Sequence, residues 1–101
     1  MAPRSQLQTV LSSIPSVKAA YFQPPATMRM EYPCIVYERS KIDTRFADNS
    51  SYLLKTRYSL TVIDRNPDSD IPMHVAQLPL CTHDRSFRSD GLNHDSFVLY
   101  F

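Results

Sequence analysis

The spacing of prolines constrains this chain more than any other feature of its sequence. Eight of its 101 residues are proline, at positions 3, 15, 24, 25, 33, 67, 72 and 79. Proline interrupts helices and is excluded from the middle of a sheet, so the elements between these positions must be short. A chain of this length also forms one domain, residues 1–101, because smaller pieces would bury too little apolar surface to fold.

Two short helices are predicted, each ended by a proline. In residues 4–14, Leu7, Val10, Leu11 and Ile14 recur at the spacing of one helical face, and Pro15 ends the pattern. In residues 70–78 the apolar stripe is Ile71, Val75 and Leu78, with Ser69 or Asp70 as the cap and Pro79 at the end.

Five strands are predicted, at residues 17–22, 32–38, 52–65, 80–88 and 93–101. The third is the clearest, because Leu60 and Val62 alternate with Ser59 and Thr61 and so mark one buried and one wet face. Asp90-Gly91 suits the positive φ of a tight hairpin turn, and the last strand is apolar on both faces, which favours a central place or an interface. The fold class is therefore α+β: a mostly antiparallel sheet with both helices on one face.

The polar segment Arg39 to Ser51 has no helical face and is predicted to be a long protruding hairpin arm or loop. It contains two isolated apolar residues, Ile42 and Phe46, among charges of both signs. A solvated loop exposes single apolar residues, but the same pattern fits an arm that docks on a neighbouring subunit with apolar anchors ringed by charge. The candidate contact residues are Arg39, Lys41, Ile42, Asp43, Arg45, Phe46, Asp48 and Tyr52.

Little in the sequence indicates catalysis or a cofactor. The single glycine, Gly91, excludes a glycine-rich phosphate-binding loop, and two cysteines cannot form a four-cysteine zinc site. A metal site could be imagined from His83 and His94 on adjacent strands, together with Cys81, Asp84 and Asp95, and a triad from Cys81 or Ser86 with His83 and Asp84. The spacing matches no metal or triad pattern, so polar residues on a solvated hairpin are the simpler interpretation. We expect no enzyme activity, no cofactor and no membrane-spanning segment.

Nucleic-acid binding is a further alternative. Six basic residues interleave with aromatic rings, which is the composition of a stacking surface for single strands. These residues are Arg39, Lys41, Arg45, Lys55, Arg57 and Arg65, with Tyr37, Phe46, Tyr52 and Tyr58 between them. Acidic residues alternate with them and the formal net charge is only +1, which favours a charge-matched protein interface instead.

A series of short segments resembles a known family. In order, they are Tyr32-Pro33-Cys34-Ile35-Val36-Tyr37, Ile42-Asp43, Ala47-Asp48-Asn49, Arg57-Tyr58, Thr61-Val62-Ile63-Asp64, Pro67-Asp68-Ser69, Asp84-Arg85, Asp90-Gly91-Leu92-Asn93-His94-Asp95 and Leu99-Tyr100-Phe101. From about Ala20 to Phe101 the chain resembles the small tail completion proteins of long-tailed bacteriophages, also called tail terminator or head–tail joining proteins.

The resemblance implies a structural virion protein without catalytic residues. Such subunits close into a hexameric ring that caps the tail tube and meets the head connector, so the expected partners are copies of this chain, the tail tube protein and the neck proteins. Ring assembly would take place in the host cytoplasm, and the finished ring would sit in the virion tail or neck. No sequence-specific nucleic-acid contact is implied, although the genome would pass through the ring lumen. The alternative function is a small nucleic-acid-binding regulatory protein.

Overall fold

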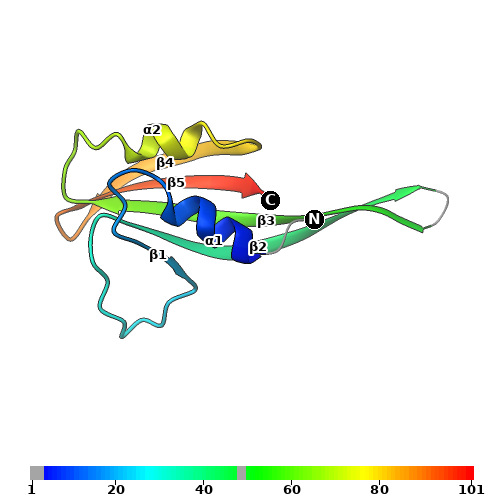
Figure 1. Ribbon diagram of the computed structural model, residues 1–101, viewed down its shortest axis with the longest axis horizontal. Coiled ribbons are helices and arrows are strands. Elements are labelled where there is room, and N and C mark those ends of the chain that lie inside the picture. The colour runs from blue at the N-terminus through cyan, green and yellow to red at the C-terminus, as the bar shows by residue number, and fades with distance from the viewer. Residues whose placement is uncertain (1–3, 48–49) are drawn as a thin grey trace.

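The computed structural model describes residues 4–47 and 50–101, and the side chains of 43–55 lie outside that description. It confirms the α+β class (Figure 1). The elements in chain order are α1 (Arg4–Ser12), β1 (Ala19–Phe22), β2 (Cys34–Ala47), β3 (Ser50–Asp64), α2 (Ile71–Ala76), β4 (Cys81–Ser89) and β5 (Leu92–Tyr100). Within the described residues, no helix is long and apolar enough to cross a membrane.

The five strands form one sheet in the order β1-β2-β3-β5-β4. Only β1 and β2 are parallel, and the other neighbours are antiparallel. The last strand, β5, therefore lies between β3 and β4, as its apolar character on both faces predicts. The turn that joins β4 to β5 has φ of 52° at Asp90 and 74° at Gly91, which are the positive values expected for this pair.

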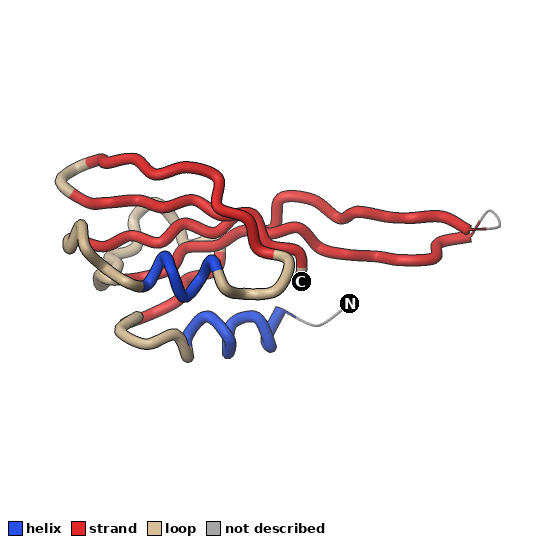
Figure 2. The backbone as a smooth tube through the Cα atoms, turned by 90° about the horizontal axis from the view of Figure 1, so that it is seen from above, coloured by secondary structure: helices blue, strands red, loops and turns tan. Residues whose placement is uncertain are grey.

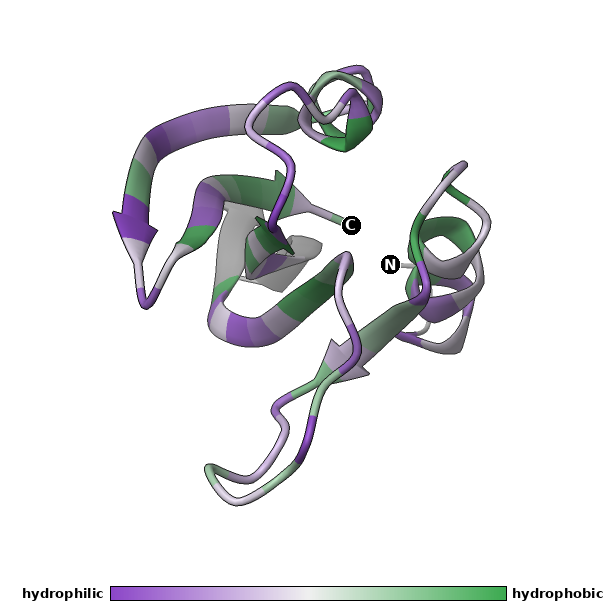
Figure 3. Cartoon of the chain, turned by 90° about the vertical axis from the view of Figure 1, so that its left-hand side faces the viewer, coloured by the Kyte–Doolittle hydropathy of each residue, from purple (hydrophilic) through white to green (hydrophobic). Residues whose placement is uncertain are grey.

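The pairing register divides the sheet into two faces. Tyr37 lies opposite Leu60, and Leu60 lies opposite Phe97, and all three are almost completely buried. We call this side the helix face, because apolar residues of both α1 and α2 pack in the same core cluster (Figure 3). The intervening residues of each strand, such as Thr61 and Val98, lie on the other side, which we call the open face.

The N-terminal helix is held on the sheet by polar contacts as well as by Leu7 and Leu11. The buried Tyr37 hydroxyl donates a hydrogen bond to Gln8 Oε1 and accepts one from Arg4 Nη1 at 3.2 Å. Gln8 Nε2 also donates to the Ala20 carbonyl at 2.9 Å, and the Arg4 guanidinium lies 4.3 Å from the Phe22 ring centroid. These contacts fix α1 across β1 and β2.

The helix ends differ slightly from the sequence expectations. The first helix stops at Ser12, and Ile14 follows in a turn that still buries its side chain. The second helix has Asp70 as its N-cap residue, but the Asp70 carboxylate makes no capping bond. Instead, Ser69 Oγ accepts the Ile71 amide at 3.3 Å, so the serine satisfies the first helical donor.

Candidate functional site: a projecting arm and an apolar groove

The most conspicuous feature of the molecule is a hairpin that extends beyond the rest of the sheet (Figure 2). The last pair between β1 and β2 is Phe22 with Tyr37, and β5 ends its pairing with β3 at Arg57. Phe101 adds one more bond, from its amide to the Thr56 carbonyl at 3.0 Å. Beyond this point, residues 43–47 and 50–55 pair only with each other in the part of the chain that the structure describes. We call these residues the arm.

The arm resolves the choice between a hairpin and a loop in favour of a hairpin. It gives the molecule an elongated shape, with principal extents of 51 × 27 × 23 Å. A two-stranded ribbon without further strands is only marginally stable in water, and its two edges present unpaired backbone groups. A ribbon of this kind gains most when another surface covers it.

A bulge at Ser40 sets how the arm leaves the sheet. Arg39 pairs with Tyr58, but the next pair is Lys41 with Arg57, so Ser40 is an extra residue in β2. Its hydroxyl donates to the Arg57 carbonyl at 3.1 Å. Because the bulge reverses the alternation, Arg39 and Ile42 share the helix face, and Lys41 lies on the open face.

The predicted contact residues therefore do not form one cluster. Arg39, Lys41 and Ile42 are all exposed at the base of the arm, with 49% of Ile42 accessible, but they divide between two faces. The backbones of Asp43, Arg45, Phe46 and Tyr52 lie on the paired strands of the arm, whereas their side chains, and all of Asp48, lie outside the described residues.

The basic stripe interleaved with tyrosines is not formed as predicted. Tyr37 and Tyr58 are buried on the helix face, where their ring centroids lie 6.1 Å apart, and they offer no ring for stacking. Arg39 and Lys41 point to different sides of the sheet because of the bulge. Basic residues that lie close together in the sequence are thus separated onto opposite faces of the sheet.

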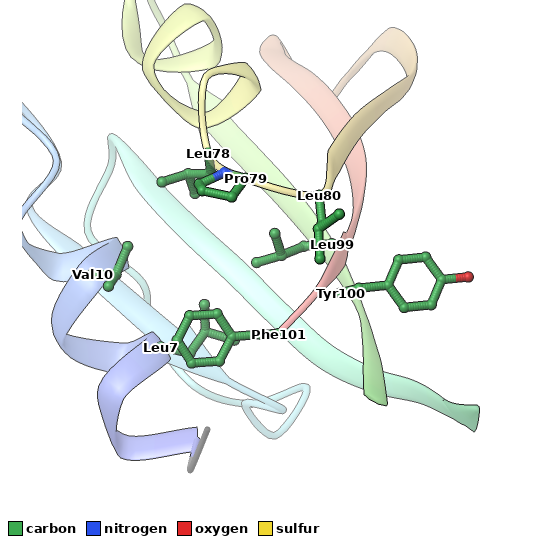
Figure 4. A pocket seen from close by; sticks show the side chains of 8 residues that line it. All are labelled: Leu7, Val10, Leu78, Pro79, Leu80, Leu99, Tyr100 and Phe101. Atoms are coloured by element: carbon green, nitrogen blue, oxygen red, sulfur yellow. The ribbon is translucent and has the colours of Figure 1, made fainter. Parts of the chain in front are cut away.

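An apolar groove lies on the helix face beside the base of the arm (Figure 4). Its volume is about 280 Å³, and it opens between α1, the α2–β4 connection and the end of β5. The lining residues are Leu7, Val10, Leu78, Pro79, Leu80, Leu99, Tyr100 and Phe101. Leu7 and Leu99 are buried, whereas Leu80 at the rim is 58% exposed.

Leu80 adopts an unusual backbone conformation at this groove. Its φ is 58°, which a bulky side chain rarely adopts and which costs about 1–2 kcal/mol. The Leu80 carbonyl accepts the Tyr100 amide at 3.2 Å, so the neighbouring strand holds the strained residue in place. The chain thus holds an exposed leucine over an apolar groove at an energetic cost, and such strain clusters at binding sites.

Sequence reasoning did not identify the groove. Its lining comes from three segments that are far apart in the chain. Taken alone, each segment predicts only the apolar face of a helix or the end of a strand. The only local signals were the Leu78-Pro79-Leu80 sequence and the terminal Phe101.

The polar residues of the β4–β5 hairpin form a cluster, although not the predicted one. His83 Nε2 lies 3.2 Å from Ser86 Oγ and 3.3 Å from Asp95 Oδ1, and Ser86 Oγ donates a hydrogen bond to Asp95 Oδ1. A bulge at Asp84 brings Ser86 to the same face as His83. The serine proton is directed at the carboxylate and a single ring nitrogen contacts both partners, so the carboxylate does not orient the histidine as a base for the serine.

The imagined metal site is not assembled. His83 pairs with Phe97 and His94 with Phe87, so the two histidines lie on opposite faces of the sheet. No three histidine, cysteine, aspartate or glutamate side chains of the described residues gather as a metal-binding group. Cys34 is buried and Cys81 partly buried, and both are free thiols.

Comparison with known proteins adds no identification, since no protein-family model, curated protein or solved structure matches this chain. The arm and the groove are therefore the features of the molecule that indicate a function.

Proposed function

We propose that this chain is a ring-forming structural subunit that completes a bacteriophage tail, with the ring on the tail tube and facing the head connector. The observation that carries the proposal is the arm, a ribbon with open edges and no covering surface within the described chain. The family resemblance of the sequence supplies the phage context and the expected ring of six.

A closed ring needs two different, complementary patches on every subunit. The arm is one patch, because it projects from the body and carries an exposed apolar residue, Ile42, at its base. The groove is the other, because it is concave, apolar and on the same face as Ile42. In the proposed contact, the arm of one subunit lies on the groove of the next.

The two patches are joined by Phe101. Its side chain lines the groove, and its amide bonds to Thr56 at the base of the arm. Ile42 pairs with Thr56, so the groove and the base of the arm are neighbours on the helix face. A neighbour seated on the groove would therefore lie close to the base of the arm.

The first test replaces Ile42 at the base of the arm, and then also Phe46 within the arm, with serine. Ile42→Ser and the double variant with Phe46→Ser are measured by size-exclusion chromatography with light scattering, with and without tail tubes. The unaltered protein should either have a native mass of about six times 11.6 kDa or attach to tail tubes. The double variant should neither form this assembly nor attach to tubes. The melting temperature of the monomer should change little, because Ile42 is half exposed.

The matched control is Met73→Ser. Met73 is exposed on α2, at 66%, and belongs to neither patch. Assembly should be unaffected by this change. The proposal would be overturned if Met73→Ser and Ile42→Ser reduced assembly equally. It would also be overturned if the unaltered protein stayed monomeric at high concentration even in the presence of tail tubes.

A second variant tests the groove without weakening the fold. Leu80→Asn removes the exposed apolar side chain and places at φ 58° a residue that tolerates this conformation well. The variant should be as stable as the unaltered monomer or more so, yet fail to assemble. If Leu80→Asn assembles normally, the groove is not the receiving patch.

A further inference from the structure

The N-terminal helix α1 forms one wall of the groove. Leu7 and Val10 of α1 line one side, and the Leu78–Leu80 connection between α2 and β4 lines the opposite side (Figure 4). Leu99 and Phe101, from the last strand and the residue after it, also line the groove. The groove is therefore a gap between separate elements, and its shape depends on where α1 lies.

The sequence of α1 gives this helix little stability of its own. The helix is only nine residues long, with no acidic residue in its first turn and no basic residue in its last turn. Isolated helices of this length are marginal in water. The hydroxyl groups of Thr9, Ser12 and Ser13 donate to carbonyls four residues earlier, at 3.1, 2.7 and 2.5 Å, and such bonds weaken a helix slightly. The segment is therefore helical because it packs on the sheet.

The helix is attached to the sheet through side chains. Leu7 and Leu11 are completely buried in the core, and Gln8 accepts a hydrogen bond from the Tyr37 hydroxyl. Among the described residues, the segment that precedes Lys18 makes backbone hydrogen bonds only within itself. Releasing α1 therefore breaks no backbone pairing between strands, so the helix can open while the sheet stays folded.

The groove leaves the packing of α1 incomplete. It has a volume of about 280 Å³ next to Leu7 and Val10, and an apolar cavity of roughly 150 Å³ is large enough to hold benzene. Atoms that border an empty space lose the dispersion contacts that a neighbour would supply. A side chain that fills the groove would contact both walls and hold α1 beside the α2–β4 connection.

We propose that α1 is a movable wall of the groove, which docks and undocks while the sheet stays folded and is held in the docked position when an apolar side chain fills the groove. In the ring, that side chain comes from the arm of the neighbouring subunit, and only this identification rests on the proposed function. A subunit with α1 undocked lacks one wall of its receiving patch and cannot accept an arm. Assembly therefore selects subunits with α1 docked, and a filled groove stabilises the docked helix in turn.

Filling the groove from within the same chain tests this coupling without a partner. Val10→Phe adds a phenyl ring on the groove side of α1, whereas Thr9→Phe adds the same ring at an exposed position of the same helix. Valine, threonine and phenylalanine have similar helix propensities, so the two variants differ mainly in where the ring lies. Hydrogen exchange is measured by mass spectrometry on dilute monomers, and peptides of α1 are compared with peptides around Leu60 in β3.

In the unaltered monomer, α1 should exchange at least about tenfold faster than the centre of β3, because the helix opens without the sheet. Val10→Phe should slow exchange in α1 about tenfold, since the added ring is buried only while α1 is docked. Thr9→Phe should leave exchange in α1 unchanged. Val10→Phe should also prevent assembly, because its ring occupies the place of the neighbour's arm. In assemblies of the unaltered protein, α1 should exchange about tenfold more slowly than in the monomer.

The inference is overturned if α1 and β3 of the unaltered monomer exchange at equal rates, because the helix would then open only with the whole domain. It is also overturned if Val10→Phe does not slow exchange in α1, if Thr9→Phe slows it equally, or if assembly leaves it unchanged. Should Val10→Phe not fold, the same comparison is made between Val10→Leu and Thr9→Leu. A protein that never assembles would refute the proposed ring, and exchange in the monomers would still decide whether α1 is a movable wall.

Discussion

Replacing Leu60 with alanine tests the core on which the whole arrangement depends. Leu60 is completely buried near the middle of β3. Its cross-strand neighbours on the helix face are Tyr37 on β2 and Phe97 on β5, and both belong to the same core cluster as Leu7 and Leu11 of α1.

The expected loss of stability lies in the upper part of the range for such changes. Buried leucine-to-alanine substitutions cost about 2–5 kcal/mol, and the cost is largest where the surroundings cannot close the cavity. Here hydrogen-bonded strands flank Leu60 on both sides, so the backbone cannot move inward. We therefore expect a loss of about 3–5 kcal/mol, which is a large part of the 5–15 kcal/mol typical of a whole domain.

The assay is equilibrium unfolding in urea, followed by circular dichroism, with Thr61→Ala as the control. Thr61 is the next residue on the same strand but lies on the open face and is partly exposed, so its replacement should cost less than about 1 kcal/mol. The Leu60→Ala melting temperature should fall by at least about 12 °C. Similar costs at the two positions would refute the assignment of faces and everything built on it.

Three further predictions concern a hydrogen-bonded tyrosine, a buried thiol and a tight turn. Tyr37→Phe removes the hydroxyl that Gln8 and Arg4 contact, and should cost about 1–2 kcal/mol and speed hydrogen exchange in α1 more than in β5. Burial, with a smaller contribution from the Asp64 carboxylate, raises the pKa of the Cys34 thiol from 9.0 to about 11, so the unfolded chain ionises first. Stability should therefore be complete below about pH 9 and fall between pH 9 and 11, and Cys34→Ala, followed by urea unfolding across that range, should show a smaller fall. Gly91→Ala places a side chain at φ 74° in open space, so it should cost about 1 kcal/mol from backbone strain alone, measurable as a lower urea midpoint.

Local patterns were sufficient for most of the fold. The helical spacing of Leu7 and Leu11, the alternation around Leu60 and the Asp90-Gly91 turn each depend on neighbours in sequence, and each predicted its element correctly. The arm was also foreseen as an extended hairpin or loop, because its segment lacks a helical face.

The sites were harder to predict because they depend on register. A β-bulge inserts one extra residue into a strand and has no distinctive local sequence. The residues around Ser40 and Asp84 therefore gave no indication that a bulge occurs at either position. The first bulge separates Lys41 from Arg39, and the second brings Ser86, in place of Asp84, beside His83 and Asp95. The groove was missed for a related reason, since its walls meet only in three dimensions.

The Ser40 bulge also restricts how the arm can change in length. Deleting Ser40 would make the ladder regular and leave Ile42 on the groove side, because Lys41 would still pair with Arg57. If Ser40 were instead paired with Arg57 as a regular ladder residue, every arm residue that follows it on β2 would turn to the opposite side, and Ile42 would lie on the open face. Lengthening both strands of the arm by two residues each would preserve the sidedness, and lengthening them by one would move the tip residues to the other side. The arm can therefore vary in reach by steps of two residues per strand, about 7 Å each, while its base keeps an apolar side and a charged side.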